Sequence, residues 1–315
     1  MSDEFMEEQQ EFLPSEPPGG MGFMTPKDSR FKVEINLGLA LPFKYYLSND
    51  YDKTAENKAI VRSVRDDGSL VMLEVTTQSN LGPLQAFEND VLLVLLTMAW
   101  EQRDLNAKSA AKERNNGFRV FYTQAEICRR LGLSVNSSNK VARAILKIKS
   151  QSLQTKNFVY NATTGDVGLL SEDTKIILKS GRIRKGSSGD DFSKYQDVFF
   201  IEFDSYIVKN LYNEYVSVIN SEDYLGLKSG PQRRVLIFLF SKRKKFGDKF
   251  VFQLSELAQV IGLVDSLKRR RQICEYLDRI KQAIPTFDFS IKKKSEIEDW
   301  DILIHFSLIE NLLTH

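Results

Sequence analysis

The sequence predicts an α+β protein that contains two similar units in tandem, one in each half of the chain. Three observations lead to this prediction. A short segment from the first half recurs in the second half, and segments with helical and strand periodicity follow each other in the same order around both copies. The chain of 315 residues, 42% of them hydrophobic, is also long enough to form about two hydrophobic cores.

The N-terminal segment, residues 1–30, differs from the rest of the chain in composition. It contains four of the eight prolines and carries seven acidic and two basic side chains, a net charge of −5. Such a composition cannot bury enough apolar surface to fold, so the segment predicts a disordered acidic tail. Its spaced apolar residues are candidates for a short partner-binding segment, and a solvated tail without a partner is the alternative: Phe5, Phe12, Leu13 and Phe23.

Residues 31–83 have the texture of β structure. Apolar and polar residues alternate from Phe31 to Ile35, and two further alternating runs flank Asp66-Asp-Gly-Ser, which is a turn signal. We expect an N-terminal β extension with a hairpin over 58–75, and it carries no recognisable chemistry.

The first unit, residues 84–204, begins with a strongly apolar helix over 87–100, for which Asn89 or Asp90 is a candidate N-cap. A strand at 118–122 follows. Thr123 and Glu126 then have the spacing of a capping box, and Gly132 suits the position just after a helix. The next helix is expected from Lys140 to about Gln154. Its apolar stripe consists of Val141, Ala144, Ile145 and Ile148, and several strands complete the unit.

The second unit, residues 205–315, repeats this organisation. The segment 121–133, FYTQAEICRRLGL, aligns without gaps with 251–263, VFQLSELAQVIGL. Both copies follow an apolar helix and precede a helix and two strands; the later helix has the apolar stripe Ile273, Tyr276, Leu277 and Ile280. This order is that of a winged helix, a helix-turn-helix completed by a β-hairpin. We therefore expect two tandem winged-helix domains.

Composition argues against several classes of protein. Two cysteines, Cys128 and Cys274, cannot form a disulfide framework or a thiolate zinc site, and both are expected to be core residues on apolar-striped helices. His305 and His315 are too few for histidine-based metal or acid–base chemistry, and His305 is expected to be structural. No phosphate-binding loop motif occurs. We expect no enzyme activity, no metal and no cofactor.

The positions of the charges indicate a nucleic-acid partner although the whole chain carries only +2. Without the tail the chain carries +7. Residues 134–156 contain five basic side chains and no acid, and the second copy opens its helix with consecutive basic residues. Ser, Asn and Arg at the start of a recognition helix can reach base edges, and Lys or Arg on wings can reach phosphates. The candidate DNA-binding residues are Asn136, Ser137, Ser138, Asn139, Lys140, Arg143 and Lys147 on the first helix, Lys179, Arg182, Arg184 and Lys185 on the first wing, Ser266, Lys268, Arg269, Arg270 and Arg271 on the second helix, and Lys292, Lys293 and Lys294 on the second wing.

Three segments resemble the RepA-type plasmid replication initiators, which bind repeated DNA sites with two winged helices. They are Leu84-Gln-Ala-Phe-Glu-Asn-Asp followed by the apolar helix, Phe200-Ile-Glu-Phe-Asp-Ser-Tyr, and Asp223-Tyr-Leu-Gly-Leu-Lys-Ser-Gly-Pro-Gln-Arg-Arg. The resemblance covers about 80–307. It implies that the second unit carries much of the specific DNA binding, and that the first contributes further DNA contact and dimerisation through exposed faces of 84–105 and the strands. The acidic tail and the β extension depart from that pattern.

The function expected from the sequence is specific binding of double-stranded DNA, with direct repeats as the site and recruitment of host replication proteins as the outcome. A chromosomal transcription or cell-cycle regulator on the same scaffold is one alternative. A tandem winged-helix module that binds proteins is a second. The chain shows neither a signal peptide nor an apolar run near the roughly twenty residues of a membrane span, so we expect a cytoplasmic, nucleoid-associated bacterial protein.

Overall fold

The computed structural model describes residues 30–40, 57–64, 70–77, 81, 84–103, 119–156, 159–160, 167–168, 174–183, 198–261, 267–292 and 300–306. The predicted tail, residues 1–30, lies outside this part of the chain except for its last residue. Helices and strands are mixed throughout, which confirms the α+β class.

The first unit has a helix, a strand, two further helices and a β-hairpin. These are α3 (Ala86–Glu101), β4 (Arg119–Tyr122), α5 (Gln124–Arg130), α6 (Ser138–Lys149), β9 (Ile177–Ile183) and β10 (Val198–Phe203). The strands form an antiparallel sheet in the order β4-β10-β9, so the last strand of the unit lies in the middle.

The second unit has the same element order and the same sheet order. It consists of α9 (Gly230–Phe246), β12 (Lys249–Gln253), α10 (Leu254–Val260), α11 (Leu267–Ala283), β13 (Phe287–Lys292) and β14 (Asp301–Phe306). Its antiparallel sheet runs β12-β14-β13. The repeated sequence segment therefore marks two units of equal topology.

Two neighbouring strands from distant parts of the sequence lie between the units. β1 (Arg30–Glu34) pairs antiparallel with β11 (Val216–Asn220), and α2 (Ile35–Ala40) packs against α9. The short helices α7 (Ser205–Tyr212) and α8 (Ser221–Gly226) flank β11. The expected domain boundaries stay a prediction, but the β1–β11 pairing crosses the expected division at residue 204.

A third region extends the first unit sideways. The predicted hairpin is confirmed as β2 (Asn57–Val64) and β3 (Leu70–Thr77), and it continues through β5 (Gln151–Lys156) to β8 (Thr174–Lys175). Two short strands, β6 (Val159–Tyr160) and β7 (Val167–Gly168), form a separate pair. The β extension is thus joined to the first unit by a sheet.

The expected extent of the helix from Lys140 to Gln154 is wrong at its C-terminal end. The helix stops at Lys149 because the chain turns at Ser150 and enters β5. The Gln151 side chain is buried and donates to the carbonyl oxygen of Lys147 at 2.8 Å, which satisfies one of the last carbonyls of the helix.

The end of α5 follows the sequence signals closely. Thr123 accepts a hydrogen bond from the backbone N–H of Glu126 at 3.1 Å. Gly132 has φ +65°, and Leu133 N–H donates to Cys128 O at 2.8 Å, the pattern of a Schellman motif. The expected cap of α3 is wrong. Gln85 occupies the N-cap, its backbone N–H donates to Glu88 at 2.8 Å, and Asn89 and Asp90 are buried inside the molecule.

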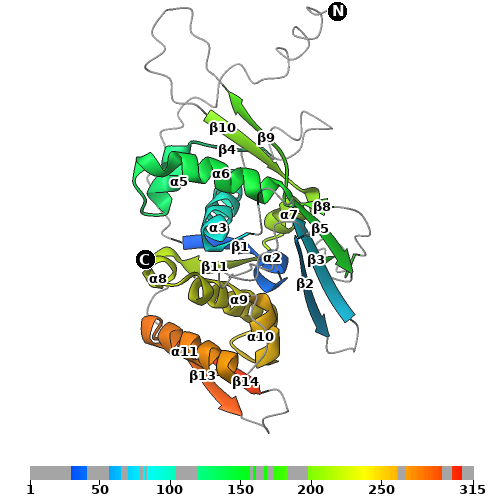
Figure 1. Cartoon of the computed structure of the whole chain (residues 1–315), viewed down its shortest axis with the longest axis vertical. Coiled ribbons are helices and arrows are strands. Elements are labelled where there is room, and N and C mark those ends of the chain that lie inside the picture. Colours follow the sequence, from blue (N-terminus) through cyan, green and yellow to red (C-terminus); the bar gives the residue numbers. More distant parts are fainter. Residues whose placement is uncertain are drawn as a thin grey trace, which may run out of the picture.

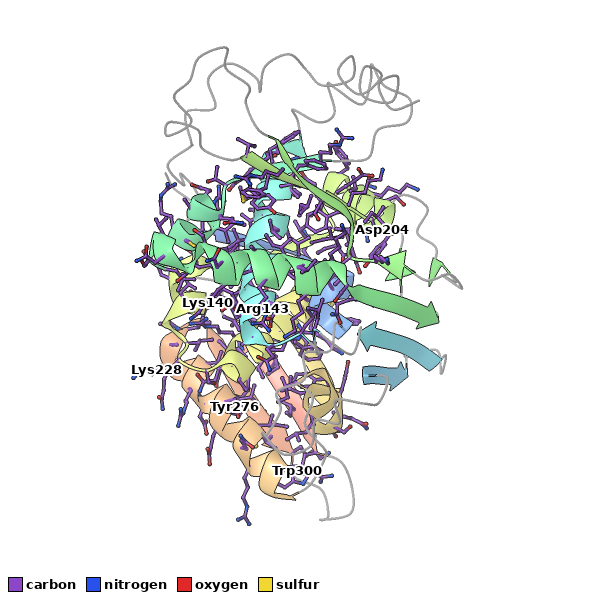
Figure 2. All side chains as sticks on the ribbon, turned by 45° about the horizontal axis from the view of Figure 1, so that its top comes forward. Lys140, Arg143, Asp204, Lys228, Tyr276 and Trp300 are labelled. Atoms are coloured by element: carbon purple, nitrogen blue, oxygen red, sulfur yellow. The ribbon has the colours of Figure 1, made fainter. Side chains whose placement is uncertain are left out.

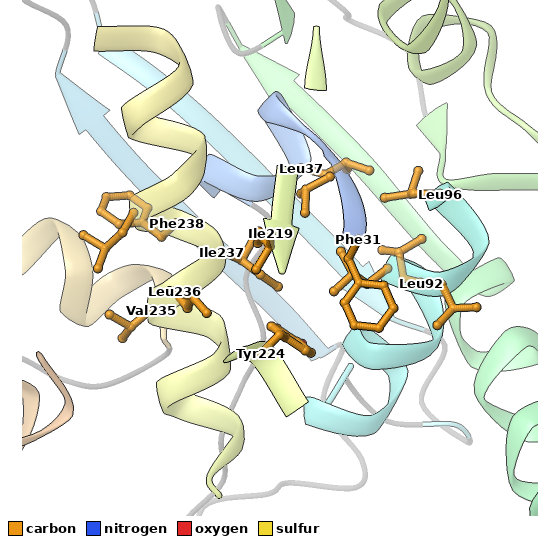
Figure 3. Close-up of a cluster of buried hydrophobic side chains, with 14 of the residues drawn as sticks. Phe31, Leu37, Leu92, Leu96, Ile219, Tyr224, Val235, Leu236, Ile237 and Phe238 are labelled. Atoms are coloured by element: carbon orange, nitrogen blue, oxygen red, sulfur yellow. The ribbon is translucent and has the colours of Figure 1, made fainter. Parts of the chain in front are cut away.

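A continuous hydrophobic core joins the units (Figure 3). At its centre Phe31 of β1 meets Tyr224 of α8 edge to face, with ring centroids 5.6 Å apart. The expected stripe of α6 and the residues Ile273, Leu277 and Ile280 of α11 are buried, as is Cys128, whereas Cys274 and Tyr276 are half-buried. Gly38 of α2 lies so close to α9 that a Cβ atom there would be 1.9 Å from Ser241 Oγ.

Along its long axis the molecule is a stack (Figure 1). The sheet of the first unit and α6 lie toward one end, and α11 with the sheet of the second unit lies at the other. α3, the β1–β11 pair and α9 occupy the middle, so the two helices expected to recognise DNA are held apart by a packed centre.

Candidate nucleic-acid interface

Helix α6 has one apolar and one polar face. Val141, Ala144, Ile145 and Ile148 are buried, and the opposite direction on a 3.6-residue helix passes through 139, 143 and 146. Asn139, Lys140 and Arg143 are exposed, and neither Lys140 nor Arg143 forms an ion pair with any described residue. Figure 2 shows both basic residues on this helix. The buried stripe therefore fixes the orientation of α6, so that Asn139, Lys140 and Arg143 face the solvent.

A tight turn positions the start of α6. The chain leaves α5 through Gly132 and forms the 3-10 turn η1 (Val135–Ser137). Ser134 accepts a hydrogen bond from Asn136 N–H at 3.3 Å, and Ser138 Oγ donates to Val135 O at 2.6 Å. Of the four residues expected to read bases here, Asn136 and Asn139 are exposed, whereas Ser137 and Ser138 are half-buried.

The prediction that Lys147 lies on the DNA-binding surface is wrong. Only 9% of the residue is exposed, and its Nζ lies 3.2 Å from Glu88 Oε1 on α3. Lys147 lies next to the buried stripe of α6, so its side chain points toward α3. Its charge therefore stabilises packing within the unit and is not available to a phosphate.

The strand β9 continues the basic surface beside α6. Lys149 Nζ donates to Ser180 Oγ at 3.2 Å, which ties the end of α6 to this strand. Lys179 is exposed and lies 3.4 Å from Glu202 Oε1, and the Arg182 guanidinium lies 5.9 Å from the ring centre of Phe199. Lys179 and Arg182, which were expected on the first wing, both belong to a strand of the hairpin. Arg184 and Lys185 lie outside the described residues.

The start of α11 contains one exposed and one buried arginine among the expected residues. Arg271 is exposed. Arg270 is only 7% exposed, and its guanidinium lies 5.7 Å from the ring centre of Trp300, so its expected place at a DNA surface is also corrected. Lys268 and Arg269 belong to the first turn of α11, and Lys292 ends β13 in an exposed position. Ser266, Lys293 and Lys294 lie outside the described residues.

A buried polar cluster joins the two units between these surfaces. Asn89 Nδ2 donates to the Tyr224 hydroxyl at 2.8 Å, and that hydroxyl donates to Asp90 Oδ1 at 2.6 Å. Arg233 Nη1 of α9 donates to Asp90 Oδ2 at 2.7 Å. Burial raises the pKa of Asp90, and its hydrogen bonds with Tyr224 and Arg233 oppose that shift. α3 of one unit is therefore tied to α8 and α9 of the other.

Sequence reasoning missed this junction and the exposed Leu146. The junction was visible only as parts of two separate motifs, because Asp90 and Tyr224 are 134 positions apart in the sequence. Leu146 could have been found from the helical period, since it falls on the polar face of α6 and is 54% exposed. The part of α3 that was expected to serve dimerisation is not accessible from Asn89 to Ala99, because all of these residues are buried.

Comparison with solved structures shows a shared fold. The selenomethionine structure of domains 2 and 3 of RctB is similar to this chain with a TM-score of 0.50 at 11% identity, over 88% of this chain and 99% of that one. A second structure of RctB domains 2–3 has a TM-score of 0.44 at 10% identity, over 87% and 97%. The Pi initiator protein in complex with iteron DNA has a TM-score of 0.44 at 11% identity, over 69% and 94%. No protein-family model and no curated protein matches the sequence. The chain therefore shares the fold of RctB domains 2 and 3.

Neither a metal site nor a membrane-spanning helix occurs among the described residues. They contain no group of three or more His, Cys, Asp or Glu side chains placed to hold a metal ion. Among the described helices, none has the length and apolar character needed to cross a membrane. His305 is exposed on β14, opposite Asp288 of β13 and Lys249 of β12.

Proposed function

We propose that the two units are winged helices and that the protein binds double-stranded DNA, with α6 and α11 as recognition helices and the β9–β10 and β13–β14 hairpins as wings. The observation that carries the proposal is the exposed face of α6. Asn139, Lys140 and Arg143 lie on it, opposite the buried stripe, and no acid occurs between residues 134 and 156. A helix of this kind fits the major groove, where Arg binds guanine and Asn binds adenine.

The wing supports the same mode of binding. Lys179 and Arg182 are two exposed cations on β9, and the contact of Lys149 with Ser180 holds that strand against the end of α6. A basic strand fixed beside a recognition helix can bind the phosphates that border the groove. In this mechanism the helix reads bases, and the strand sets its position on the duplex.

The finer role we propose is that of a replication initiator that binds direct repeats and recruits host replication proteins. The three segments that resemble the RepA-type initiators support it, and two of them contribute Asn89, Asp90, Tyr224 and Arg233 to the junction between the units. A transcription or cell-cycle regulator would need the same DNA surface. A protein-binding module would not need two exposed cations on a face of α6 that contains no acid. Self-association, a partner for the acidic tail, nucleoid association and the absence of catalysis belong to the same proposal.

A binding titration with paired variants tests the proposal. The full chain is titrated against labelled duplex DNA by fluorescence polarisation at several salt concentrations. The double variant Lys140→Ala/Arg143→Ala is expected to lose at least about tenfold in affinity, with little change in the salt dependence, because both side chains are assigned to base edges and not to phosphates. The control is Lys281→Ala, which removes an exposed cation at the far end of α11 that pairs with Asp288 at 2.5 Å.

Two results would contradict the proposal. Equal binding by the wild type and the double variant would remove α6 from the interface. Failure of the wild-type chain to bind any duplex at low salt would reject DNA binding as such and favour the protein-binding alternative.

A further inference from the structure

The exposed face of α6 contains an apolar side chain among its polar ones. Leu146 is 54% exposed, although the buried stripe of the same helix is almost completely covered. It lies seven residues after Asn139 and three after Arg143, spacings that place all three side chains on one face. Ala142, which is half-buried, is the small residue between them.

The position of Leu146 distinguishes it from other exposed apolar residues. Single apolar side chains on a surface are ordinary and need no explanation. Leu146, however, lies on the face that the proposed function turns toward DNA, between Arg143 and Lys149 in the sequence. Val135, at the other end of the same helix-turn segment, is 61% exposed. If Lys140 and Arg143 bind DNA, Leu146 contacts the same stretch of DNA.

In a major groove the matching apolar group is the C5-methyl of thymine. It is the only methyl group on the edges of the four base pairs, and apolar side chains are its usual contacts. From Asn139 to Leu146 the helix rises about 10 Å, which is roughly three base-pair steps. An Asn that binds adenine and a Leu that contacts thymine can therefore act on separate base pairs of one short site.

We propose that Leu146 is a specificity-determining residue that recognises a thymine methyl group in the DNA site of the first unit. This inference rests on the proposed function, because it needs α6 to lie in a major groove. It adds that the site contains an A·T pair whose identity is read by methyl contact and not by hydrogen bonding alone.

The test compares thymine with uracil, which differ by this methyl group only. A duplex is first selected from a random library with the wild-type chain, and each thymine of the selected site is then replaced singly by deoxyuridine. Wild-type affinity is expected to fall about fourfold at one thymine position, the factor that loss of one buried methyl-sized group gives. Leu146→Ala is expected to bind the thymine and uracil duplexes equally.

The matched control is Val251→Ala, which truncates an apolar side chain of similar exposure, 59%, on β12, a strand that belongs to neither a proposed recognition helix nor a proposed wing. This variant should keep the fourfold discrimination. Discrimination that survives in Leu146→Ala, or a wild type that binds both duplexes equally at every position, would overturn the inference while leaving DNA binding intact. If the wild type selects no duplex, the proposed function fails as well. If Leu146→Ala keeps the discrimination but lowers the molar mass in light scattering, the side chain serves contact between copies of the chain instead.

Discussion

The two proposed recognition helices share a fold position but differ in how their charges are arranged. Lys140 and Arg143 are exposed on α6, and the whole helix contains no acidic residue. On α11 the exposed acids Glu275 and Asp278 lie between the exposed Arg271 and Arg279. The exposed charges of α6 are all positive and attract phosphates, whereas a phosphate meets charges of both signs on α11. The two helices therefore have the same place in their units but different surface charges. We expect α11 to contact DNA through its first turns only.

The two units also differ in the ion pairs that join their first two helices. In the repeat, Glu126 corresponds to Glu256. Glu126 binds Arg130 at 2.8 Å, and Arg130 in turn binds Glu101 at the end of α3. Glu256 binds Lys242 of α9 directly, also at 2.8 Å. Each glutamate thus ties its short helix to the first helix of the unit, once through an arginine and once without it.

The largest effects are expected from cavities in the two cores. Ile148→Ala in the first unit and Ile273→Ala in the second each remove a fully buried side chain and should lower the free energy of unfolding by about 2–5 kcal/mol. Because one hydrophobic core joins the units, each variant should shift a single urea transition, followed by both circular dichroism and tryptophan fluorescence. Two separate transitions would show that the units unfold independently.

The next largest effect is expected in DNA affinity, and it should differ between α6 and α11. Arg143→Ala on α6 should weaken binding of a selected duplex by about 1–3 kcal/mol if the arginine makes a bidentate contact with guanine. Arg279→Ala, an exposed arginine next to Asp278 on α11, should change affinity less than about twofold because the acids already weaken attraction there. Polarisation titrations at one salt concentration measure both, and equal losses would contradict the difference drawn between the helices.

The smallest effect concerns the junction between the units. Tyr224→Phe removes the hydroxyl shared by Asn89 and Asp90 without opening a cavity, and should cost about 1–2 kcal/mol because two buried groups each lose a partner. The control Tyr212→Phe removes a hydroxyl whose residue is 38% exposed and should change stability by less than about 0.5 kcal/mol. Urea denaturation measures both. Equal stability of the two variants would mean that the buried cluster does not hold the units together.

Much of the local structure could be predicted from the sequence. The repeat indicated the order of elements in both units, the apolar stripes of α6 and α11 indicated which faces are buried, and Gly132 indicated a left-handed helix end. These features depend on residues within one or two turns of each other. The end of α6 was misplaced because its polar last turn is followed by residues that enter a strand only through pairing with β3.

The candidate site could be predicted in part. Asn136, Asn139, Lys140 and Arg143 lie where the helical period places them, on the exposed side of α6 and its preceding turn. Lys147 and Arg270 do not, because Glu88 and Trp300, which come from other elements, lie against them. A basic residue at the edge of an apolar stripe can turn inward or outward, and only the neighbouring element decides which.

By itself, the sequence determined the two-fold repetition, the helix faces and the concentration of positive charge on one of them, since each follows from periodicity and composition within a segment. Only the tertiary structure decided how the units are joined. The pairing of β1 with β11, the contact of Tyr224 with Asp90 and the inward turn of Lys147 bring together residues from distant segments. Such contacts form because buried polar groups must find partners wherever packing brings surfaces together, and no local pattern specifies that partner.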